Sequence, residues 1–170
     1  MNYKWIGAAM IICGCGLTGF MISAAYRREE RDLRQFISAL DYMTCELQYR
    51  RSPLPDLCRL AGAERSGCIG RLFINLANEL DAQISPDVQS CLAAAAATAG
   101  QLSPRIQEVV CILGASLGRF DLEGQLQGLE AARAFCREQL ETMSQGRDTR
   151  LRSYQTLGLC AGAALAILFV

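Results

Sequence analysis

Two long apolar runs lie near the ends of the chain, and a stretch of mixed apolar and polar residues separates them. Residues 5–26 carry no charged side chain, and a second apolar run covers residues 153–170. As helices with a rise of ~1.5 Å per residue, the runs would be about 33 Å and about 27 Å long, against the ~30 Å hydrocarbon core of a bilayer. The strongly apolar part of the second run starts only at Leu157, so the second span is marginal in length. The pattern therefore predicts two transmembrane helices, with residues 1–4 as a short external N-terminus.

The stretch between the runs, residues 27–152, repeats its apolar residues at helical spacing and has no strand-like alternation. Apolar faces of this kind recur within residues 69–80, 106–117 and 122–143. Serine-proline pairs at 52–53, 85–86 and 103–104 predict helix starts, because serine caps a helix and proline fits its first turn. The first apolar face consists of Leu33, Phe36, Ile37, Leu40, Met43 and Leu47.

These signals together predict an all-α chain. The helices would form an antiparallel bundle of about six, placed as one domain between an N-terminal and a C-terminal transmembrane helix. The first and last of them would continue into the apolar runs without a break. The expected helices cover residues 28–51, 53–63, 67–82, 86–99, 104–117 and 122–170.

Arginines gather on the inner side of both apolar runs. Cytoplasmic segments next to membrane spans carry an excess of Lys and Arg, so the stretch 27–152 is predicted to be cytoplasmic. The first group is mixed with Glu29, Glu30 and Asp32, which fits an exposed helix with local ion pairs and attraction to anionic headgroups. The flanking arginines are Arg27, Arg28, Arg31 and Arg34 after the first run and Arg147, Arg150 and Arg152 before the second.

Small residues recur at a spacing of four inside both runs. Such stripes let helix backbones approach closely in lipid, so the two spans are candidates to pack on each other or on partner helices. The alternative is that small residues are simply common in membrane spans. The residues concerned are Cys15, Gly19 and Ser23 in the first run and Gly158, Gly162 and Ala166 in the second.

The composition of the chain removes several classes of function. Its 170 residues include 17 basic and 17 acidic side chains and no histidine. This balance argues against a nucleic-acid binder, which normally carries a basic excess. Without histidine the chain lacks the commonest general base and the commonest metal ligand. We therefore expect no enzyme activity, no cofactor or metal, and no small-molecule substrate.

Nine cysteines are scattered along the chain without a C-x-x-C pair or any zinc-ligand spacing. The interpretation is that they are reduced, buried thiols that pack as small apolar residues. A small membrane-bound thiol enzyme is one alternative, with Cys45, Cys68 or Cys111 as the nucleophile. It would lack the histidine base that usually activates such a thiol.

An exported or lipidated envelope protein is a second alternative. Residues 23–25, Ser-Ala-Ala, resemble a signal-peptidase site, and residues 12–15 are a poor relative of a lipoprotein box. The apolar run is long for a signal-peptide core, and arginines follow it at once. Both features argue against cleavage.

Two corners between predicted helices carry the candidate partner interface. Residues 50–55 form a stiff, proline-rich corner, and residues 117–125 join the fifth and sixth helices. In the second corner Gly118 can take the left-handed conformation that ends a helix, and Asp121 can cap the next one. The candidate interface residues are Pro53, Pro55, Arg119, Phe120, Asp121 and Gln125.

Several short motifs follow one another in a fixed order between the two apolar runs. They are residues 31–35 (Arg-Asp-Leu-Arg-Gln), Glu46 and Tyr49 before Pro53-Leu54-Pro55, Leu117-Gly118 before Asp121 and Gln125, and Leu157-Gly158. Their order and spacing resemble those of the stage III sporulation protein AB family of endospore-forming bacteria. The resemblance extends over the whole chain, from the N-terminal span to a C-terminal one.

This resemblance implies a function that the residues alone do not reach. The family belongs to the membrane complex that links mother cell and forespore, and its soluble domain looks like the cytoplasmic domain of the platform protein of type II secretion and type IV pilus systems. The chain would then be a platform or adaptor without catalysis, in the mother-cell membrane. Its implied partners are other stage III sporulation A-type membrane proteins and a secretion-type ATPase, stage III sporulation protein AA.

Overall fold

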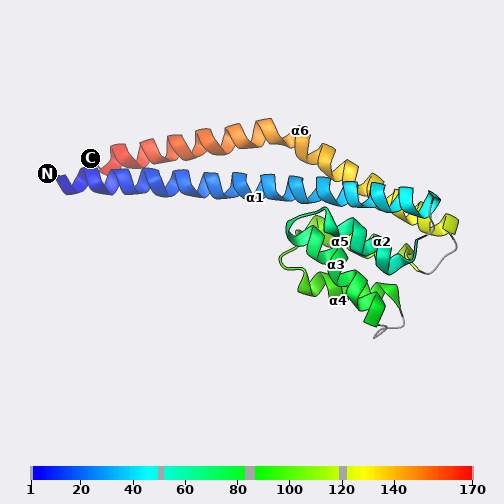
Figure 1. Ribbon diagram of the computed structural model, residues 1–170. Helices are drawn as coiled ribbons and strands as arrows, with labels where there is room; N and C mark the ends of the chain where they lie inside the picture. Colours follow the sequence, from blue (N-terminus) through cyan, green and yellow to red (C-terminus); the bar gives the residue numbers. More distant parts are fainter. Residues whose placement is uncertain (1, 50–51, 83–86, 119–121, 170) are drawn as a thin grey trace. The chain divides into compact units, whose positions relative to one another are not determined.

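The structure, a computed structural model, contains only α-helices in the part of the chain that it describes (Figure 1). It describes the backbone of residues 2–49, 52–82, 87–118 and 122–169, and the side chains of residues 21, 23–49, 52–82, 87–118 and 122–145. Within these residues the prediction of an all-α chain with about six helices is confirmed. The helices are α1 (Asn2–Tyr49), α2 (Leu54–Ala63), α3 (Gly67–Ala82), α4 (Val88–Thr98), α5 (Pro104–Ser116) and α6 (Leu122–Phe169).

The chain forms two compact units. The core unit is Arg31–Leu140, and the hairpin unit combines Met1–Glu30 with Glu141–Val170. The helices α1 and α6 each run from one unit into the other, as the sequence predicts for the first and last helices.

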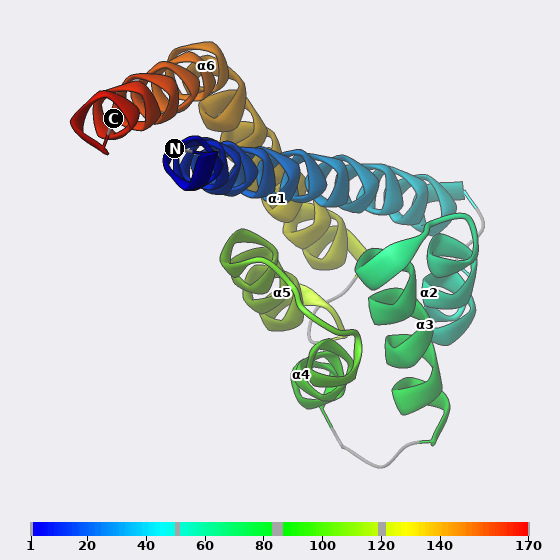
Figure 2. The ribbon, with the colours of Figure 1, turned by 90° about the vertical axis from the view of Figure 1, so that its left-hand side faces the viewer.

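In the core unit the short helices pack in chain order, α2 on α3, α3 on α4 and α4 on α5 (Figure 2). The predicted apolar faces point inward: Leu33, Phe36, Leu40 and Met43 of α1 are fully buried. Burying each large apolar side chain contributes roughly 1.5–3 kcal/mol relative to leaving it in water. The hydrophobic pattern therefore placed most of the core correctly, with Ile37 of the same face half-buried.

Polar contacts attach the turn between α2 and α3 to α1. The guanidinium of Arg65 donates to the backbone oxygen of Ser38 at 2.7 Å and to its hydroxyl at 3.0 Å. The same guanidinium lies 5.8 Å from the centre of the Tyr42 ring, within cation–π range. Beside it, Gln35 donates to the hydroxyl of Ser66 at 3.3 Å. These contacts fix the hairpin of α2 and α3 along the second half of α1.

The helix-start signals have mixed outcomes. At α5 the prediction is confirmed, because the Ser103 hydroxyl accepts a hydrogen bond from the backbone N–H of Ile106 at 3.4 Å. At α2 it is wrong by one residue: the helix begins at Leu54, with Pro53 at the cap position. No side chain caps this helix, and the Ser52 hydroxyl donates to the carboxylate of Glu46 at 3.5 Å.

The start of α4 also differs from the prediction. The helix begins at Val88 after Asp87, whose backbone is extended and whose side chain makes no capping hydrogen bond. The predicted start used Ser85 and Pro86, and both lie outside the described residues.

In the hairpin unit the first part of α1 and the last part of α6 lie side by side and antiparallel (Figure 1). The Tyr26 hydroxyl donates to the backbone oxygen of Met143 at 3.2 Å and links the two segments. No helix within the fully described residues is both long and apolar enough to cross a membrane. The predicted spans, residues 5–26 and 153–170, lie outside those residues except at positions 21 and 23–26.

Candidate partner-binding site

The last turns of α1 present one buried and one exposed large side chain. Leu47 is 7% exposed and is the last residue of the apolar face of the helix. Tyr49, two residues further on, is 81% exposed. An aromatic ring offers a large contact area at little cost in side-chain entropy, which makes Tyr49 suited to contact another molecule.

The corner after α1 is held by its neighbours and by proline. Pro53 has φ −55° and ψ 143°, an extended conformation in which its ring restricts φ. Its backbone oxygen accepts from the N–H of Leu57 at 3.0 Å, the first hydrogen bond of α2. Pro55 follows in the first turn, where the missing N–H costs no hydrogen bond. In the described part of the corner Pro53 is exposed and Pro55 is half-buried, and residues 50 and 51 lie outside the described residues.

The second corner begins with Gly118, which has φ +74°. A Cβ at this position would lie 2.3 Å from Cγ2 of Val88. Both the left-handed backbone and the close approach require glycine here, so the predicted role of Gly118 is confirmed. The residues after it, Arg119, Phe120 and Asp121, lie outside the described residues, and the cap at Asp121 stays a prediction.

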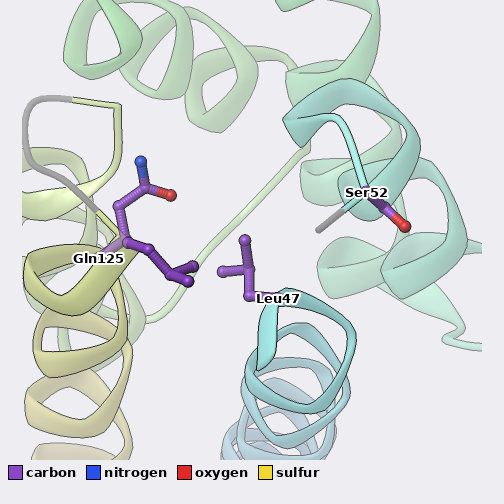
Figure 3. Close-up of a pocket in the computed structure, with 4 residues that line it drawn as sticks. Leu47, Ser52 and Gln125 are labelled. Atoms are coloured by element: carbon purple, nitrogen blue, oxygen red, sulfur yellow. The ribbon is translucent and has the colours of Figure 1, made fainter. Parts of the chain in front are cut away.

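The two corners meet at one groove. Its volume is about 300 Å³, and it is lined by Leu47 from α1, Ser52 from the corner before α2, and Leu122 and Gln125 from the first turn of α6. Figure 3 shows Leu47 between Gln125 on one side and Ser52 on the other. Side chains that are far apart in the sequence thus form one surface feature within the core unit. We call it the corner groove.

The lining of the corner groove suits binding rather than proton or group transfer. Its four side chains are two leucines, a serine hydroxyl and a glutamine amide, and none of them titrates near neutral pH. The leucines favour an apolar side chain, and the hydroxyl and amide supply hydrogen-bond donors and acceptors that orient it. The groove can therefore hold a short segment or a single large side chain of another molecule.

The structure brings together only part of the predicted site. Gln125 lines the corner groove, and Pro53 and Pro55 follow directly after one of its walls. Sequence reasoning missed three of the lining residues, Leu47, Ser52 and Leu122, as site residues. The apolar pattern assigned both leucines to the core, and only the meeting of two distant corners opens a groove between them. Tyr49 was also missed, although it stands in the family motif before Pro53.

The flanking arginines that the structure describes, Arg27, Arg28, Arg31 and Arg34, are all exposed. Among the predicted packing residues Ser23 is half-buried. The side chains of the remaining flanking and packing residues lie outside the described ones: Arg147, Arg150, Arg152, Cys15, Gly19, Gly158, Gly162 and Ala166.

The cysteines have two kinds of environment. Cys58, Cys68, Cys91 and Cys136 are buried, whereas Cys45 and Cys111 are exposed, so the prediction of buried thiols is wrong for these last two. Both lie on outward faces of their helices, α1 and α5, a placement that periodicity alone assigns weakly for a single small residue. Burial raises the pKa of the Cys58 and Cys136 thiols to about 12. These two thiols are therefore protonated and structural at neutral pH.

Comparison with known proteins identifies the family of this chain. The family model of stage III sporulation protein AB matches residues 4–170. The chain belongs to this family. A search of curated proteins found no match.

A solved structure titled stage III sporulation protein AB (SpoIIIAB) has the same fold as this family member. It is 18% identical, with a TM-score of 0.64, over 72% of this chain and 98% of the solved one. At that identity the likeness supports the fold, and the family model supplies the connection to sporulation. The family is a sporulation family, and the resemblance predicted from the motifs is confirmed.

Proposed function

We propose that the chain is a non-catalytic platform or adaptor in the channel complex between mother cell and forespore, and that it docks a secretion-type ATPase, stage III sporulation protein AA. Family membership supports a role in a sporulation complex. The finer role rests on one observation, the uncharged corner groove at the end of α1.

The composition of this region fits a protein interface. The centres of protein interfaces are depleted in charged side chains and enriched in aromatic ones, with hydrogen-bonding groups around them. The corner groove has uncharged walls. Tyr49 is exposed two residues after Leu47 and is turned about 200° from it around α1, so it offers a second contact outside the groove. A few such residues usually carry most of the binding energy. We therefore assign Tyr49 and Gln125 as principal contacts of the partner.

The proposal includes anchoring in the mother-cell membrane by residues 5–26 and 153–170, with residues 27–152 in the cytoplasm. Packing of the two spans through their small residues would leave other faces for the other stage III sporulation A-type membrane proteins. Support for this arrangement comes from the uncharged runs and the arginines that flank them.

The docking proposal predicts the effect of single substitutions on capture of the ATPase. Tyr49→Ala and Gln125→Ala should each weaken binding by tenfold or more, since truncating a principal interface contact costs about 1.4 kcal/mol or more. The thermal midpoint should change little for Tyr49→Ala, because its ring is 81% exposed. The measurement is a pull-down with the purified ATPase and a melting curve on the same variants.

The matched control is Gln127→Ala, because Gln127 has the same side chain on the same helix and is exposed outside the groove lining. It should bind the ATPase as the unmodified protein does. If a folded Tyr49→Ala/Gln125→Ala protein binds the ATPase as tightly as the unmodified protein does, the assignment of the groove as the docking site is wrong.

The membrane topology gives a separate prediction. A single cysteine introduced by Asn2→Cys, in a variant whose native cysteines are replaced, should react with a membrane-impermeant thiol reagent only from the outer side of the membrane. The reason is the excess of arginine on the inner side of the first run. Labelling of this cysteine from the cytoplasmic side alone would show that the predicted topology is wrong.

A further inference from the structure

The helix α4 carries no charge on the side that it turns to solvent. It packs on α3 and α5 at the edge of the core unit (Figure 2). Residues 88–104 contain no charged side chain. The solvent side of a helix ordinarily carries charged residues, whereas the centres of protein interfaces are depleted in them. The exposed face of α4, which we call the α4 face, consists of Gln89, Ser90, Ala93, Ala94, Ala97 and Thr98.

The neighbouring helices of the core unit follow the ordinary pattern. Each of α2, α3, α5 and α6 has charged side chains exposed to solvent, so the absence of charge is particular to α4 among these helices. Exposed examples are Arg59, Arg71, Glu108 and Glu130.

Opposite charges lie at the two ends of the α4 face. Just after α4, the backbone oxygen of Ala99 accepts from Nε of Arg71 at 2.9 Å, and this is the only hydrogen bond of Arg71 within the described residues. Its two terminal amino groups therefore keep their donors for another ligand. Just before α4, the half-buried Asp87 makes no capping hydrogen bond with its side chain.

The two charges are placed evenly about the middle of the face. From Asp87 to Ala99 the helix axis covers about 18 Å, and Ala93 lies midway. A two-fold axis through the middle of a surface brings each of its ends to the opposite end of a second copy. Two copies of α4 would then lie antiparallel, with Arg71 of each copy at Asp87 of the other.

We propose that the α4 face, with Arg71 and Asp87 at its ends, is a contact between two copies of this chain. A second copy is favoured over another protein because the face is complementary to itself in charge. The small side chains of Ala93, Ala94 and Ala97 let the two helices approach closely. The contact shares no residue with the corner groove and does not depend on docking of the ATPase.

The size of the face sets the strength of the contact. A pair of 11-residue helices is about 17 Å long and buries less than the ~800 Å² per partner of a standard interface. The association is therefore weak and reversible between free molecules. It becomes effective where several copies are held close together, because the local concentration is then high.

The test uses the full-length protein in detergent, carrying either of two affinity tags. One tagged form is captured, and the amount of the other form retained is measured over a range of concentrations. An exposed ion pair contributes up to about fivefold in affinity. Arg71→Glu, like Asp87→Arg, turns both end contacts of the dimer from attractive to repulsive, so each variant should self-associate at least tenfold more weakly.

Mixing these two variants gives the sharpest prediction. When one tagged form carries Arg71→Glu and the other carries Asp87→Arg, both end contacts again join opposite charges. Capture between the two forms should therefore return close to that of the unmodified protein. This recovery requires that both variants are folded, and neither loss of structure nor a contact elsewhere in the chain would produce it.

A third variant tests the middle of the face. Ala93→Glu places two like charges near the two-fold axis, so capture of the second form should be lost. The matched control is Ala134→Glu, which makes the same change at an exposed alanine of α6 and should leave capture unchanged. Melting curves show that both variants are folded.

Three results would overturn the proposal: no self-association of the unmodified protein, undiminished self-association of Ala93→Glu, or no recovery in the mixed pair. If Ala93→Glu self-associates normally but loses the ATPase in the pull-down, the α4 face binds another protein and the proposal of a second copy is wrong. If the groove variants retain the ATPase while Ala93→Glu loses self-association, the docking proposal fails and this one stands.

Discussion

Replacing Phe73 with alanine is expected to lower the free energy of unfolding of the core unit by about 3–5 kcal/mol. Phe73 is fully buried on α3, and its ring centre lies 5.4 Å from that of Phe36 on α1, at an angle of 44°. The substitution removes buried apolar surface, leaves a cavity and breaks a favourable ring pair. Single domains are stable by about 5–15 kcal/mol, so this is a large part of the total. Urea unfolding of the fragment 27–152, followed by circular dichroism, measures the loss.

The neighbouring residue is the matched control. Ile74 is 38% exposed, although it is next to Phe73 and equally apolar in the sequence. Ile74→Ala should therefore cost less than about 1 kcal/mol, because water already reaches the side chain and little cavity forms. Equal losses for the two variants would mean that the packing of α3 against α1 is not as described.

Raising the pH above about 9 should destabilise the core unit through two buried thiols. An unfolded cysteine has a pKa of about 8.5, whereas burial raises the pKa of Cys58 and Cys136 to about 12. Between these values the unfolded chain releases the two protons and the folded chain keeps them, so the equilibrium shifts toward unfolding. The stabilising contribution is complete below the unfolded pKa, and it falls by about 1.4 kcal/mol per pH unit for each thiol as the pH rises toward 12.

The measurement is the free energy of unfolding of the fragment 27–152 at several pH values between 8 and about 11 under reducing conditions. Cys58→Ala and Cys136→Ala should each flatten the pH dependence, whatever they do to the stability at pH 8. Cys111→Ala is the control, because this cysteine is exposed and its removal should leave the slope unchanged. A slope that survives in the Cys58→Ala/Cys136→Ala variant would assign the alkaline transition to other groups.

The sequence by itself determined most of the secondary structure and of the core. Helical periodicity depends on the spacing of neighbouring residues, so it identified the buried face of α1 and the bounds of α3 directly. The cap at Ser103 and the left-handed Gly118 are likewise local features, each set within a few residues of chain. Motif order and spacing were enough to indicate the family that the family model then showed.

Only the tertiary structure decided which surfaces these elements share. Ser52 carries a capping signal, yet α2 begins after Pro53, and the Ser52 hydroxyl donates to Glu46 near the end of α1. Leu47 and Leu122 are ordinary core residues in the pattern, and the groove between them exists because two corners far apart in the chain meet. Periodicity records which side of a helix is apolar. It carries no information about which other helix covers that side, how completely it does so, or that Tyr49 is left in water.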